Sequence, residues 1–389
     1  MSLALLTYTA IVIPLIGFLL NYVFSGRPNI RDTSTLIIAF LTFFTVSIIT
    51  FINGNNYTEL PIIFSVVSGL EIRLHLEPLG LVFALIASGL WILTHIYGIG
   101  YMRANAEKNQ TRFFAFFCLA ISSTLGIAFS ANLFSLFVFY EILTLSTFPL
   151  VAHKASAEAI KGARVYLGIL VSTSIVFFLP AIIWIFSVVG TLDFTHGGII
   201  RNDFTPLSTM YLLILFAFGI GKAAIFPIHP WLPSAMVAPT PVSALLHAVA
   251  VVKAGVFSVL KIGIYIFGIE HLSNTSSSLW LVWLAAFTIL FASMVAISKD
   301  NLKSRLAYST VSQLSYIILG LALATTAGVL GAALHIVMHA FGKITLFMTA
   351  GSIYVTTKKT EISDMIGLGR IMPFTFFAFF IGSLSIIGI

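Results

Sequence analysis

Long apolar runs separated by short polar stretches dominate the chain. A helix that crosses a bilayer needs about 20 mostly apolar residues. Runs of that kind predict about twelve membrane-spanning helices in an all-α, multi-pass chain. They cover residues 3–24, 35–53, 80–101, 113–129, 131–151, 165–188, 209–228, 241–268, 278–297, 304–323, 326–355 and 371–389.

One connection has a different pattern. Residues 71–77, with the sequence EIRLHLE, alternate strictly between polar and apolar side chains. That period is typical of a β-strand whose two faces differ. We therefore expect the connection at residues 54–79 to form a small β-hairpin that caps the outer end of the helices.

Composition narrows the class of protein. Hydrophobic residues make up 59% of the 389 residues and charged residues only 8%, against about 25% charged in a typical soluble domain. This excludes a soluble enzyme, a nucleic-acid-binding protein and a disordered chain. The single cysteine, Cys118, cannot form an internal disulfide. The chain has no flavin, iron–sulfur or dinucleotide signature, so no cofactor is expected.

The basic residues predict the orientation. Loops that follow odd-numbered spans hold 14 of the 20 basic residues, whereas the other loops hold only Arg73 and Arg201. Basic loops face the cytoplasm, so we expect an inner (cytoplasmic) membrane protein with its N-terminus outside. The 14 residues are Arg27, Arg31, Arg103, Lys108, Arg112, Lys154, Lys161, Arg164, Lys299, Lys303, Arg305, Lys358, Lys359 and Arg370.

Ionisable residues inside the spans are the candidates for function, because each costs about 2.5–3.5 kcal/mol to insert. Glu141 is the acid that we place within a span, and Lys222 and Lys253 have apolar sequence on both sides. Pro227 and Pro230 remove backbone donors soon after Lys222. We therefore expect the helix to break just past Lys222, and transporters place ion sites at such breaks.

Three further residues share one helix face. His335, His339 and Lys343 follow one another at intervals of four, which predicts a stripe suited to proton relay. No acid or cysteine lies nearby in the sequence to complete a metal site, so none is expected. Lys261 lies near the outer end of its span, where a lysine is expected to extend its amine to the surface.

Several motifs resemble a known family. EILTLSTFPLV, GKAAIFPIHPWLPSAMVAPTPVSALLHAVAVVKAGVF, STVSQLSY and HIVMHAFGKITLF are similar to the antiporter-like subunits of Mrp cation/proton antiporters, respiratory complex I and membrane-bound hydrogenases. HAVAVVKAG, with PNIRD and LEPLGLVFALIASGLWILTHIYGIGYMR, most resembles the D-type subunits of Mrp antiporters.

The resemblance implies an architecture of about 14 spans with two inverted five-helix repeats. It places N-terminal helices in residues 1–112, the first repeat in 113–268 and a truncated second repeat in 278–389. It also implies broken helices at the seventh and twelfth spans. The chain stops at GSLSIIGI, where the second break should begin, so either it is a fragment or something else completes the half-channel.

The resemblance also implies roles for single residues. Glu141 and Lys222 match the family's functional pair, and Lys253 matches its central lysine. The histidine and lysine of the eleventh span match His335 and Lys343. Three further histidines are candidates. We expect His229 to be an entry group for protons, and His247 and His339 to bridge between the other groups.

The function expected is that of a proton-translocating subunit of a multi-subunit Na⁺/K⁺–proton antiporter, with other membrane subunits as partners. A first alternative is the equivalent proton-pumping subunit of complex I or of a membrane-bound hydrogenase, whose redox chemistry lies on other subunits. A second alternative is a structural membrane scaffold whose ion pairs stay fixed. The residues leave open which cation moves.

Overall fold

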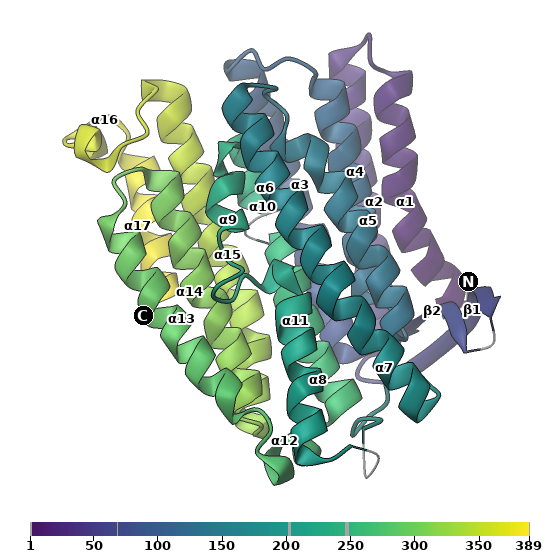
Figure 1. Ribbon diagram of the computed structural model, residues 1–389. Helices are drawn as coiled ribbons and strands as arrows, with labels where there is room; N and C mark the ends of the chain where they lie inside the picture. Colours follow the sequence, from purple (N-terminus) through teal and green to yellow (C-terminus); the bar gives the residue numbers. More distant parts are fainter. Residues whose placement is uncertain (1, 68, 201–203, 246–248, 389) are drawn as a thin grey trace.

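The computed structural model describes residues 2–67, 69–200, 204–245 and 249–388, and most of them are helical (Figure 1). Four helices form the N-terminal side of the molecule: α1 (Leu3–Val23), α2 (Pro28–Asn53), α3 (Pro78–Ala104) and α4 (Gln110–Ala128). The middle and the far side consist of α5 (Leu133–Val151), α6 (Ala157–Thr173), α7 (Leu179–Val189), α8 (Pro206–Gly219), α9 (Trp231–Ser234), α10 (Thr240–Leu245), α11 (Val251–Ile262), α12 (Ile269–Thr275), α13 (Leu279–Ser298), α14 (Leu302–Ala322), α15 (Thr326–Thr357), α16 (Leu368–Ile371) and α17 (Pro373–Ile387).

Local sequence explains where these helices begin. Side chains of Ser, Thr or Asn cap the first turns of several helices, as Asn132 does for α5 and Thr325 does for α15. Proline occupies the first position of others, where its missing N–H has no helical partner in any case. Pro28 of α2 and Pro78 of α3 are examples.

Eight helical segments in the described part of the chain are long and apolar enough to cross a membrane, or nine if the bent pair α11–α12 counts as one span. One of them joins α6 to α7 through a π-helical segment, Ser174–Phe178. The rest of the predicted spans are shorter, as in α8 and α17, or more polar, as in α14. The prediction of an all-α, multi-pass membrane protein is confirmed, but its count of twelve spans is not.

The predicted hairpin is present. Strand β1 (Thr58–Val67) pairs antiparallel with β2 (Leu70–Leu76), at the end of the helices opposite α16 (Figure 1). A hairpin that only caps the helices would expose its polar side chains to water, and this hairpin does not expose all of them. His75, on the polar side of β2, and Glu77 just after the strand are both buried, because the end of β2 packs against α5.

The predicted break lies earlier than expected. Helix α8 ends at Gly219, and Lys222 itself lies in a single 3-10 turn, Gly221–Ala223. Pro227 and Pro230 fall inside the interrupted stretch and do not start it. A Cβ on Gly219 would lie 2.4 Å from the backbone nitrogen of Phe178. The chain therefore turns where two glycines allow close packing, before the prolines exclude a helix.

Helix α17 runs without a break through GSLSII to Ile387. The second broken helix that the resemblance implies is therefore absent from the described residues. Helices α13, α14, α15 and α17 pack together on the far side, and α10 and α11 lie between this group and the N-terminal helices. The assignment of residues 113–268 and 278–389 to inverted repeats stays a prediction.

Candidate functional site

Lys222 is fully buried at the break. Its Nζ donates a hydrogen bond to the carbonyl oxygen of Tyr140, at 2.8 Å, and to Oγ1 of Thr144, at 2.5 Å. The same nitrogen lies 3.1 Å from the centre of the Tyr140 ring. Helix α5 therefore holds the ammonium group with neutral oxygens and an aromatic face.

Close packing fixes the position of the Lys222 backbone. A Cβ on Gly255 of α11 would lie 2.4 Å from the carbonyl carbon of Lys222 and from the nitrogen of Ala223. Only a glycine permits this approach. Since Gly255 follows Lys253 by two residues, the contact also brings the two lysines to neighbouring elements.

Glu141 is adjacent to this site but forms no ion pair with Lys222 within 4.0 Å. Its side chain is partly buried, and its Oε1 has no hydrogen-bond partner among the described residues. The neighbouring residues Ile142 and Leu145 are exposed. The ion pair that the resemblance implies between Glu141 and Lys222 is therefore not formed in this structure, and Glu141 lies toward the exposed face of α5.

Lys253 and the stripe on α15 meet. Nζ of Lys253 lies 2.5 Å from Nδ1 of His339, and both side chains are buried. The His339 ring stacks on His335, with the centroids 5.8 Å apart and the planes at 7°. His335 is more peripheral and faces the ring of Tyr316. The structure thus places His339, and not His335, in contact with the central lysine.

Lys343 continues the same helix face and is fully buried. Its Nζ donates to Oγ of Ser309, at 2.8 Å, and to the carbonyl oxygen of Leu306, at 3.3 Å. Both acceptors belong to α14. No carboxylate lies within ion-pair distance of Lys222, Lys253 or Lys343 in the part of the chain that the structure describes.

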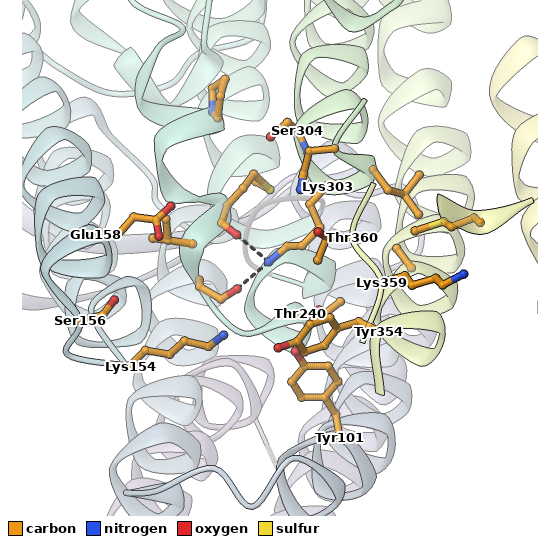
Figure 2. Close-up of a pocket in the computed structure, with 18 residues that line it drawn as sticks. Tyr101, Lys154, Ser156, Glu158, Thr240, Lys303, Ser304, Tyr354, Lys359 and Thr360 are labelled. Carbon is orange, nitrogen blue, oxygen red and sulfur yellow. Dashed lines mark hydrogen bonds between the residues drawn. The ribbon is translucent and has the colours of Figure 1, made fainter. Parts of the chain in front are cut away.

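A cavity of about 340 Å³ opens near these helices, at the end that carries the basic loops. Figure 2 shows Lys303 in its centre, where Nζ donates to the carbonyl oxygens of Met236 and Ala238, at 2.6 Å each. Lys154, Tyr101 and Tyr354 also line it. Lys303 therefore joins the segment after the break to the start of α14, six residues before Ser309.

Two other candidates lie elsewhere. His229 is buried among aromatic rings, stacked on Phe226 and in edge contact with Phe291. It does not line the cavity at Lys303, so its role as an entry group stays a prediction. His247 lies outside the described residues.

The expectation for Lys261 is wrong. Its Nζ lies 2.8 Å from Oε1 of Glu77, and neither side chain is exposed. The amine does not extend to the surface, because an ion pair and two backbone carbonyls, those of Ala128 and Ser130, hold it inside. Sequence reasoning missed Glu77 because it ends the alternating segment EIRLHLE, whose polar side chains were expected to face water. One signal was available in the sequence. Glu77 precedes an expected span at its outer end, and Lys261 lies near the outer end of another, so the two were expected at the same depth in the membrane.

The arrangement has a definite chemical capability. A contact between a lysine and a histidine nitrogen needs one donor and one acceptor, so the pair shares a proton that either nitrogen can hold. Two positive charges in a medium of low dielectric repel each other strongly. Uptake of a proton at one buried group therefore favours release from its neighbour, which is the elementary step of a relay.

Comparisons with known proteins identify the family. Residues 130–389 match the family described as "NADH:quinone oxidoreductase/Mrp antiporter, TM". Residues 65–114 match a second family, described as "NADH-Ubiquinone oxidoreductase (complex I), chain 5 N-terminus". The first match covers more than half of the chain, including every lysine of the site.

Relatives come from both branches. A probable K⁺/H⁺ antiporter A/B subunit of Rhizobium meliloti is 35% identical over 82% of this chain and 32% of its own length. NADH-quinone oxidoreductase subunit N of Desulforudis audaxviator is 33% identical over 78% of this chain and 62% of its own. Chloroplastic NAD(P)H-quinone oxidoreductase subunit 5 of Nuphar advena is 30% identical over 97% of this chain and 53% of its own length. The chain thus spans about a third to two thirds of these relatives.

Two solved structures share the fold. One is the membrane-bound sulfane sulfur reductase, an archaeal respiratory complex, with a TM-score of 0.87, 26% identity and coverage of 98% of this chain and 78% of that one. The other is the Mrp complex of Dietzia sp. DQ12-45-1b, with a TM-score of 0.83, 26% identity and coverage of 99% and 43%. The chain therefore belongs to the NADH:quinone oxidoreductase/Mrp antiporter family of transmembrane subunits.

Proposed function

We propose that this chain is a proton-translocating subunit, of the D type, of a multi-subunit Mrp antiporter that exchanges Na⁺ or K⁺ for protons across a cytoplasmic membrane. Protons move along Glu141, Lys222, Lys253, His339 and Lys343, with His335 as a side station. The observation that carries this proposal is the direct contact of Lys253 with His339 in a fully buried setting.

The cavity at Lys303 fits the entrance of this path. It lies at the basic end of the molecule, and its polar lining suits ordered water. Ser309, whose Oγ accepts a hydrogen bond from Lys343, follows Lys303 by six residues on α14, an axial rise of about 9 Å at 1.5 Å per residue. The cavity at Lys303 and an acceptor of the buried Lys343 ammonium therefore lie on the same helix.

The test is transport by the assembled complex in inverted membrane vesicles. Lys222→Ala removes an ammonium group from the path, and we expect antiport to fall to background. Glu141→Ala should act in the same direction. Lys161→Ala is the matched control, because Lys161 is exposed on α6, and it should retain wild-type rates. Wild-type antiport by Lys222→Ala at normal abundance would contradict the proposal.

A second candidate is a proton-pumping subunit of a redox-driven membrane complex. The sulfane sulfur reductase resembles this chain over more of its own length than the Mrp complex does. Subunits that co-purify with the chain decide between the two: cluster-bearing proteins support the redox complex, and small membrane proteins support the antiporter.

A further inference from the structure

A second group of titratable side chains, three buried and one exposed, lies near the hairpin, at the end of the helices opposite α16 (Figure 1). It consists of Tyr57, His75, Glu77 and Lys261. His75 and Glu77 come from the end of β2 and the residue before α3, and Lys261 comes from α11. None of these residues belongs to the path proposed above.

The inner end of this group is an ion pair. Besides Glu77, the ammonium of Lys261 contacts the carbonyl oxygen of Ser130 at 2.8 Å. The rings of Phe194 and Phe257 lie 4.9 and 5.5 Å from its Nζ. Burial would raise the pKa of Glu77, but the Lys261 ammonium outweighs this and, with His75, lowers it to about 2. The carboxylate is therefore charged.

The outer end reaches the surface. Nδ1 of His75 lies 2.9 Å from the hydroxyl of Tyr57, and Tyr57 as a whole residue is 42% exposed. The hydroxyl proton of Tyr57 is directed to the carbonyl oxygen of Phe194, so its oxygen accepts the proton of Nδ1. A neutral imidazole carries one proton. Nε2 of His75 is therefore an acceptor, and it has no hydrogen-bond partner among the described residues.

That acceptor faces another acceptor. Nε2 of His75 lies 3.6 Å from Oε1 of Glu77. Two buried acceptors that face each other leave a position for one proton, because a proton between them would satisfy both. A proton arriving there converts His75 to an imidazolium. When Tyr57 takes the Nδ1 proton and releases its own hydroxyl proton to solvent, the ring is left neutral and protonated at Nε2, and transfer of that proton back to Nδ1 resets it.

A stacked aromatic pair lies between Lys261 and Lys253 along α11. Lys261 follows Lys253 by eight residues on α11, about 12 Å along the axis at 1.5 Å per residue. Between them Phe257 stacks on Phe83 of α3, with the centroids 4.6 Å apart. A buried pair of stacked rings of this kind blocks the passage of water until the rings separate.

We propose that Tyr57, His75, Glu77 and Lys261 form a branch through which the first half of the chain exchanges protons with the solution on the hairpin side, gated by Phe83 and Phe257. The proposal rests on the function proposed above. Groups that face the branch from other elements are Arg73, which pairs with Asp193 at 2.7 Å and Glu59 at 3.5 Å, and Tyr265. Arg73 and its carboxylate partners contribute charge near the branch, whereas the Tyr265 hydroxyl is neutral and interacts with Glu77.

The first test replaces the ion pair by neutral side chains of similar size, Glu77→Gln together with Lys261→Met. The double change leaves no unpaired buried charge, so we expect the complex to assemble. Proton flux in vesicles should fall at least tenfold. The control is Glu59→Gln, which alters an exposed carboxylate on the same hairpin and should leave flux unchanged.

The second test uses His75, in case the double variant does not assemble. His75→Gln should lower flux at least tenfold, because an amide does not carry a proton. His75→Ala should also lower proton flux, and imidazole added on the hairpin side should restore it. A purely structural role for His75 would not produce this rescue. Wild-type flux in assembled His75→Gln, or slow His75→Ala that imidazole does not rescue, overturns the branch. If either of these results is found while Lys222→Ala still abolishes flux, the branch is wrong but the proposed function is retained.

Discussion

Nζ of Lys253 and Nδ1 of His339 lie 2.5 Å apart in the interior, although 86 positions separate the two residues in the chain. The contact joins α11 to α15, and its geometry allows one proton to lie between the two nitrogens. His335 touches this site only through its stacked ring. The two histidines of one helical stripe therefore differ in what they are able to do.

This difference gives a direct prediction. His339→Gln keeps an acceptor near Lys253 but cannot pass a proton onward, so proton flux should fall at least tenfold. His335→Gln should lower flux less, because His335 has no contact with the lysine. Fluorescence quenching in inverted vesicles, corrected for protein abundance, measures both rates. Equal losses in the two variants would show that the stack, rather than the contact, carries protons.

Thr144 should matter through its hydroxyl alone. Thr144→Val has nearly the same shape but removes an acceptor from the Lys222 ammonium, and a hydrogen bond to a charged group is worth about 1.5–3 kcal/mol. We expect antiport to fall several-fold, with a loss of thermal stability of that order. Thr144→Ser should restore both. A valine variant that transports normally would mean that the carbonyl of Tyr140 is sufficient.

Gly255→Ala tests the packing that positions Lys222. The added Cβ meets backbone atoms at 2.4 Å, which cannot move aside as a side chain would. We expect a destabilisation of about 1–3 kcal/mol, typical of an overpacked site, and reduced transport. Gly168→Ala on α6 is the control, since no atom lies within 4 Å of its Cβ. Thermal unfolding in detergent should show little change or a gain for the control.

The buried histidine of the hairpin predicts a pH dependence of stability. Burial, aided by the Lys261 charge, lowers the pKa of His75 from 6.5 to about 4. Between these pH values the unfolded chain binds a proton that the folded chain does not, so stability falls as pH drops from about 6.5 to 4 and this loss ends below 4. A shift of that size corresponds to about 3 kcal/mol.

His75→Gln should flatten this part of the curve. Burial lowers the pKa of His153 to about 4 as well, so some slope should remain in the variant. The measurement is the melting temperature of the purified complex at pH steps from 7 to 4. If the pH dependence of the melting temperature has the same slope in the variant, then His75 is hydrated and its pKa is not lowered by folding.

Much of the architecture follows from the sequence because a bilayer imposes simple rules. Backbone groups without water must bond within helices, so apolar runs of sufficient length mark α1 to α5 and α15. Alternating residues marked the hairpin. The cost of burying charge singled out Lys222, Lys253 and Lys343, which the structure shows to be fully buried.

Tertiary structure alone decided the partners of these charges. Lys261 stands near a helix end, where sequence favours contact with water, yet Glu77 from a distant segment reaches it and makes burial possible. The same holds for His339, which shares a stripe with His335 and becomes distinct only when Lys253 approaches. Glu141 lacks the partner that its motif suggests. Local sequence fixes which groups must avoid lipid, whereas the pairing of those groups depends on how distant helices pack, which no local pattern records.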